Sequence, residues 1–135
     1  MKDPTHLYTA FSGIFLLLQG TSTLAFRLFP PLDEAFPALL AITQMVPSHS
    51  ILHIITGVIA LTVLFRGGSR GTFWFTLLFG AFYFGLAVFG LATGHATMLH
   101  LQPFDHPFHL ALGGLGFLAV GVAFYQSQNR KEMTL

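Results

Sequence analysis

Four long apolar stretches without lysine, aspartate or glutamate constrain this chain more than any other feature of its sequence. They lie at about 7–29, 50–65, 73–93 and 108–125. Crossing the hydrocarbon core of a bilayer takes about 20 apolar residues in a helix. The 135 residues are 53% hydrophobic and only 8% charged, whereas about a quarter of a soluble domain is charged. The sequence therefore predicts one all-α transmembrane domain, an integral membrane four-helix bundle.

The charged residues between the spans predict how the bundle is oriented. The positive side chains Lys2, Arg66, Arg70, Arg130 and Lys131 all fall on one side of a four-span chain. The acidic Asp33, Glu34 and Asp105 fall on the other side, and Arg27 is the exception. Because positive residues concentrate in cytoplasmic segments, we expect both termini to be cytoplasmic and the acidic side to face outward.

The segment between the first two spans carries its own helical pattern. Apolar residues recur every three or four positions from 36 to 45. This period is typical of an amphipathic helix. We therefore expect a short interfacial helix over 36–45 that lies on the outer membrane surface.

Two short stretches, "HIITG" at 53–57 and "HLALG" at 109–113, indicate an internal repeat. With His53 placed over His109, Gly57 falls over Gly113 and His49 falls over Asp105. The sequence thus predicts two copies of one helical hairpin, related by an axis along the membrane normal. The second and fourth spans then face each other across the bundle centre, with the two repeated histidines at equal depth.

The repeated stretches bring several potential metal ligands to one end of the bundle. Residues four apart share one face of a helix, so His49 pairs with His53 and Asp105 pairs with His109. His106 lies three residues before His109 and can replace Asp105. Three imidazoles and a carboxylate are ligands for Zn²⁺, iron or copper. These five residues therefore form a candidate metal site.

Haem b is an alternative ligand for the same histidines. A bis-imidazole haem needs one axial histidine on each of two facing helices, which His53 and His109 provide. Gly57 and Gly113, one turn further along the same faces, would leave room for the flat ring, although small residues equally serve close helix packing. The chain has no cysteine, so covalent c-type attachment is excluded.

A purely structural role for the histidines is the third alternative. Ser48 or His49 would then cap the second helix, and Asp105 would cap the fourth. His53 and His109 would hydrogen-bond to carbonyl groups of the outer loops and hold those loops in place.

The two histidine motifs also resemble those of a prokaryotic family of small four-span membrane proteins, catalogued as a domain of unknown function. That family carries Pro-x-His-Asn-x-x-His-x-x-x-Gly and Asp-Asn-x-x-His-x-x-x-Gly. The matching residues here are Pro47, His49, His53, Gly57, Asp105, His109 and Gly113. Ser50 and His106 stand where the family has asparagine. The resemblance covers about residues 11–124 and implies a four-helix fold in a prokaryotic plasma membrane, without supplying an activity.

These patterns favour a non-enzymatic binding or accessory protein of the lipid bilayer, whose outer-face histidine cluster binds a metal ion or haem. One alternative is a structural subunit, packed into a larger redox or photosynthetic membrane complex or into a homo-oligomer. Another is a metal-dependent membrane hydrolase, although no separate glutamate base stands near the histidines. The chain has no basic run, so we expect no nucleic-acid partner.

Overall fold

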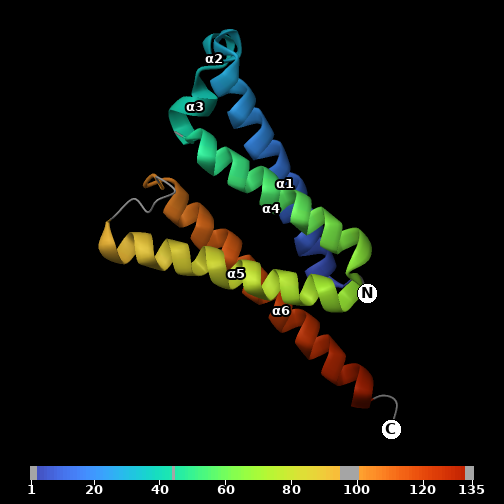
Figure 1. Ribbon diagram of the computed structural model, residues 1–135. Coiled ribbons are helices and arrows are strands. Elements are labelled where there is room, and N and C mark those ends of the chain that lie inside the picture. Colours follow the sequence, from blue (N-terminus) through green and yellow to red (C-terminus); the bar gives the residue numbers. More distant parts are fainter. Residues whose placement is uncertain (1–2, 44, 95–100, 133–135) are drawn as a thin grey trace.

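The computed structural model describes residues 3–43, 45–94 and 101–132. For Thr43 and for residues 130–132 it describes the backbone alone. Four helices are long and apolar enough to cross a membrane: α1 (Pro4–Leu28), α4 (Pro47–Arg66), α5 (Gly68–Thr93) and α6 (Asp105–Glu132). They form two hairpins, α1 with α4 and α5 with α6 (Figure 1). No strand occurs in the described residues. The predicted all-α four-helix bundle is confirmed.

The helices extend beyond the apolar stretches that predict them. Each of the four helices starts a few residues before its apolar stretch. Helices α1 and α4 each carry a proline in the first turn, where no backbone N–H group is needed for a hydrogen bond within the helix. The last helix also continues past residue 125 through polar residues. Only about a third of each apolar window is buried within the chain, which leaves the rest of its surface to contact lipid.

The described part of the segment between α1 and α4 contains two short helices, and the second of them falls within the range 36–45 where the sequence predicts a helix. They are α2 (Pro30–Ala35) and α3 (Ala38–Thr43). The break lies at Phe36, whose φ of −136° and ψ of 63° are not helical. Pro37 follows it, and proline disfavours the helical conformation of the residue that precedes it. The proline therefore divides the segment.

Glycines set the distance between the two helices of each hairpin. A Cβ atom at Gly57 of α4 would lie 2.8 Å from the backbone nitrogen of Leu17 in α1. A Cβ atom at Gly113 of α6 would lie 2.6 Å from the backbone nitrogen of Phe84 in α5. Both hairpins are thus packed backbone against backbone, as small residues permit in membrane helices.

We call the side of the bundle that holds the α4–α5 turn and the start of α1 the turn side, and the opposite side the loop side. On the turn side, threonine pairs join the hairpins. The hydroxyl oxygens of Thr5 and Thr72 are 3.2 Å apart, and so are those of Thr9 and Thr76. All four side chains are fully buried. Their hydroxyls satisfy one another and fix α1 against α5.

An aromatic core lies between the turn side and the loop side. Tyr8 donates its hydroxyl hydrogen to the carbonyl oxygen of Leu112 at 2.7 Å, which joins the two hairpins again. Its ring meets the edge of Phe79 at 6.2 Å between centroids. Leu16 and Tyr83 complete the buried cluster toward the loop side. The core therefore brings α1, α5 and α6 together below the loop side.

Candidate metal site

Three histidines meet between the hairpins on the loop side. His49 and His53 come from the first two turns of α4, and His109 comes from the second turn of α6. One ring nitrogen from each lies within 4.8 Å of the other two. The three side chains are only 2%, 1% and 1% exposed, respectively. The structure therefore brings together three of the five residues in the predicted metal site.

The ring geometry follows from the helix positions of the three residues. His49 and His53 are four residues apart on one face of α4, and their ring centroids are 4.5 Å apart with the planes at 79°. His109 approaches from the other hairpin, with its ring centroid 6.2 Å from that of His49. The ligand set thus contains two residues of one hairpin and one residue of the other.

The hydrogen-bonding state of these rings is unusual for buried polar groups. Both ring nitrogens of His53 and both of His109 are shielded from solvent and have no hydrogen-bond partner among the described residues. A neutral imidazole has one donor and one acceptor, and a buried polar group left unsatisfied costs about 1–3 kcal/mol. The hydrogen bonds to loop carbonyls that a structural role predicts are absent from the described part of the chain.

Asp105 does not join the three histidines. It is buried, and its Oδ2 atom accepts a hydrogen bond from the backbone N–H of Gln102 at 2.8 Å. The carboxylate also interacts electrostatically with His49 across the two hairpins. Asp105 therefore lies beside the histidines as a charged neighbour.

The expected helix caps are wrong as well. The N-cap residue of α4 is Val46, and no side chain caps that helix. Ser48 and His49 both lie within its first turn. Asp105 is likewise part of the first turn of α6. Both helices begin earlier than the apolar pattern suggests, which moves these polar residues from the cap into the helix.

His106 also lies outside the group of three histidines. Its ring packs directly on Gly90 of α5, in the place that a Cβ atom there would occupy. The matching position in the first hairpin is Ser50, whose hydroxyl lies 2.8 Å from that of Thr23 in α1. Both positions thus face the neighbouring helix of their own hairpin. Two more histidines, His95 and His100, stand between the third and fourth spans in the sequence and lie outside the described residues.

Gly57 and Gly113 do not leave room for a haem ring, so that expectation is wrong. Each faces the backbone of its partner helix within the hairpin, at 2.8 Å and 2.6 Å for a Cβ atom added there. The space beside each glycine is therefore already filled by α1 or α5. These two residues determine how closely the helices pack.

Tyr83 of α5 is a residue of the site that sequence reasoning missed. Its ring meets that of His109 edge to face, with centroids 4.8 Å apart, and lies 6.5 Å from that of His53. The side chain is 2% exposed and stacks on Phe79 on its other side. A lone tyrosine in a span rich in phenylalanine was the available signal, because a buried hydroxyl needs a polar neighbourhood.

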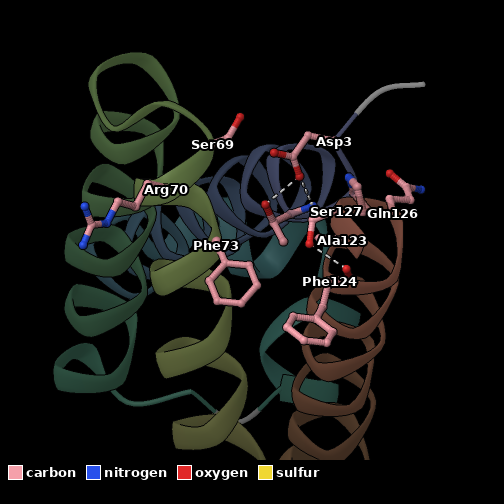
Figure 2. Close-up of a pocket in the computed structure, with 10 residues that line it drawn as sticks. Asp3, Ser69, Arg70, Phe73, Ala123, Phe124, Gln126 and Ser127 are labelled. Atoms are coloured by element: carbon pink, nitrogen blue, oxygen red, sulfur yellow. Dashed lines mark hydrogen bonds between the residues drawn. The ribbon is translucent and has the colours of Figure 1, made fainter. Parts of the chain in front are cut away.

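A separate cavity of about 690 Å³ opens on the turn side (Figure 2). Asp3 lines it and caps α1, accepting hydrogen bonds from the backbone N–H and the hydroxyl of Thr5 at 3.0 and 2.7 Å. Burial raises the pKa of Asp3, but these hydrogen bonds outweigh it and hold the pKa below its ordinary value. Arg70 points away from the other lining residues. The polar groups of this cavity therefore do not converge on a ligand.

The three histidines have the composition of a transition-metal site. Tetrahedral zinc bound at about 2.0–2.1 Å needs ligand nitrogens about 3.3 Å apart. The histidine nitrogens all lie within 4.8 Å of one another, so the three rings converge closely enough for one ion to contact all of them. Three protein ligands leave a fourth coordination position for water or another molecule.

Comparisons of the chain with protein-family models, with curated proteins and with solved structures find no match. The resemblance of the histidine motifs to a four-span prokaryotic family stays a prediction.

Proposed function

We propose that this chain is a membrane protein that binds a transition metal ion through His49, His53 and His109. One observation carries the proposal: the ring nitrogens of His53 and His109 are buried without hydrogen-bond partners and converge on His49. A bound ion would give each ring a partner for one nitrogen, which lowers the penalty of burying it. Metal binding then stabilises the fold, because the unfolded chain has no preformed site.

The donor types limit which ions fit. The chain has no cysteine, and the group that the structure assembles has no carboxylate. Imidazole suits zinc, copper, nickel and iron, whereas magnesium and calcium prefer oxygen ligands. Zn²⁺ is therefore the first ion to test, with copper and iron next.

A binding role has more support than hydrolysis. A zinc hydrolase needs a general base within reach of the metal-bound water. The acidic neighbour of the site is Asp105, whose Oδ2 atom already accepts a hydrogen bond from Gln102. The open coordination position is thus better suited to holding a small ligand than to activating water.

We also infer that the two hairpins are copies of one unit. Gly13 and Gly80, which fall together when "FSGIFLL" at 11–17 is placed over "LFGAFYF" at 78–84, hold equivalent places in the two hairpins. The carbonyl oxygen of Gly13 would lie 2.9 Å from a Cβ atom at Gly57, and that of Gly80 would lie 2.8 Å from one at Gly113. These matched contacts support a duplication.

In such a duplicated bundle, His53 and His109 are equivalent ligands from the two copies. His49 corresponds to Asp105, so the third imidazole comes from the first copy alone. The charge pattern of the sequence supports an outer-face location for this loop-side site, and the resemblance of the histidine motifs supports a prokaryotic plasma membrane. The site would therefore exchange metal with the outer medium.

The direct test is a zinc titration of the detergent-purified protein against a chromophoric chelator. We expect one ion per wild-type chain. We expect His53→Gln and His109→Gln each to weaken zinc binding at least ~100-fold. Mutating a residue that only supports a metal ligand already weakens binding about 10–100-fold, and these two residues are the ligands themselves. His6→Gln is the matched control, since His6 is exposed at the start of α1. Equal affinity in all four proteins would contradict the proposal.

A further inference from the structure

We propose that the bound ion also joins the two hairpins, so that metal occupancy sets their separation on the loop side. The inference rests on the metal binding proposed above. His49 and His53 belong to α4 in the first hairpin, and His109 belongs to α6 in the second. An ion held by all three therefore links the hairpins by coordination bonds. This link is independent of any ligand at the open fourth coordination position.

The hairpins are otherwise joined unevenly. Among the described residues, hydrogen bonds join the hairpins at the first two turns of α1, through Thr5, Tyr8 and Thr9. In Figure 1, α1 and α5 start close together on the turn side and end far apart on the loop side. The turn side is thus already joined in the absence of a ligand.

On the loop side, the rings of His49 on α4 and His109 on α6 approach each other, with 6.2 Å between their centroids. The extensive helix contacts of the fold are those of α1 with α4 and of α5 with α6, within each hairpin. The rings of His53 and His109 donate and accept no hydrogen bond among the described residues. Within the described part of the chain, these two rings therefore contribute no hydrogen bond that holds the hairpins together at this level.

Coordination would fix the spacing between the rings. The three nitrogens all lie within 4.8 Å of one another, and tetrahedral zinc holds its ligand nitrogens about 3.3 Å apart. An ion bound to all three would therefore hold α4 and α6 at one separation. The hairpins are packed rigidly at Gly57 and Gly113, so they would move as units about the threonine pairs, in the manner of a hinge.

Spin-label distances test this, and the absence of cysteine makes the labelling simple. We would label the double variant Ile51→Cys/Leu110→Cys, whose positions are exposed on α4 and α6. The control pair Ile51→Cys/Leu18→Cys lies within the first hairpin, on α4 and α1. Adding Zn²⁺ should narrow the α4–α6 distance distribution and leave the control distribution unchanged.

Two further results separate this inference from the metal site itself. If the chelator titration shows zinc bound with wild-type affinity but the α4–α6 distances do not change, the link between hairpins is wrong and the metal site stands. If the titration shows no binding, both proposals fail. Adding His109→Gln to the labelled pair removes the only ligand on α6 and should abolish the zinc effect. A zinc effect that persists in that variant would overturn the bridging role.

Discussion

Threonine hydroxyls on the turn side and imidazole rings on the loop side are both buried between the same two hairpins, but their hydrogen bonding differs. Thr9 and Thr76 hydrogen-bond to each other at 3.2 Å. His53 and His109, equally buried, have no partner for any ring nitrogen among the described residues. Paired polar groups stabilise the protein as it stands. Unpaired ones stabilise it only when a ligand binds, so the contrast separates a structural joint from a binding site.

Replacing one loop-side ligand should have the largest effect. In His53→Leu, we expect Zn²⁺ affinity to fall at least ~100-fold, because outer-shell changes alone reach 10–100-fold. The metal-free protein should become more stable by about 1 kcal/mol, since two unsatisfied buried nitrogens are removed. Chelator titration and SDS unfolding followed by circular dichroism measure the two effects. A metal-free variant less stable than wild type would show that the ring is structural.

The rigidity of each hairpin is tested by Gly113→Ala. A Cβ atom there would lie 2.6 Å from the Phe84 nitrogen and 2.8 Å from the Gly80 oxygen. Overpacking of this kind costs about 1–3 kcal/mol, and the backbone atoms have little room to move. Gly114→Ala is the control, because nothing lies within 4 Å of its added carbon. Similar SDS-unfolding midpoints for the two variants would contradict the close packing.

Removing the hydroxyl that crosses the core should have a smaller effect. Tyr8→Phe loses the 2.7 Å hydrogen bond to the Leu112 carbonyl. We expect a loss of about 1 kcal/mol in unfolding free energy and no change in zinc affinity. A weaker zinc site with unchanged stability would mean that this bond serves the loop side instead.

The threonine joint should be weaker still for each single bond. Thr76→Val removes the contact with Thr9 and the hydrogen bond to the Thr5 carbonyl oxygen at 3.3 Å, and it keeps the side-chain shape. Hydrogen bonds between membrane helices average about 0.6 kcal/mol, and we expect a destabilisation of about that size for each bond lost. Thr62→Val is the control, since Thr62 is exposed and bonds within α4 only. Equal unfolding free energies for the two variants would show that the threonine pairs do not stabilise the contact between the hairpins.

The smallest effect concerns the cap of α1 and gives a pH dependence. Asp3→Ala should destabilise the protein by about 0.5 kcal/mol, the lower end for a helix cap. The folded-state pKa of Asp3 lies below its ordinary value of 3.8, so its contribution is present above that pH and is lost as pH falls through the folded pKa. Wild type and variant should therefore converge in stability at low pH. A difference that persists there would contradict the role of the carboxylate.

The fold could be predicted from the sequence because its main determinant is local. A charge-free apolar stretch of about 20 residues must satisfy its backbone in the bilayer, and a helix does so within one segment. The sequence pattern was less informative where one residue redirects the chain. Pro37 separates α2 from α3, and the apolar period indicated a helix only in the range of α3.

The site was less predictable, because it depends on how each helix is rotated. The spacing of His49 and His53 fixes their common face on α4. The positions of Asp105 and His106 depend instead on the packing of α6 against α5, where the ring of His106 lies on Gly90. Tyr83 reaches the site from α5 for the same reason. These are contacts between segments far apart in the sequence, which no local pattern encodes.

X-ray absorption at the zinc edge tests the central claim most directly, because it counts the imidazole ligands of a bound ion. We would load the wild-type protein with one equivalent of Zn²⁺ and compare it with His109→Gln. The account predicts three imidazole nitrogens at about 2.0–2.1 Å in the wild type and two in the variant. A zinc ion bound without imidazole, or with the same imidazole count in both proteins, would contradict it.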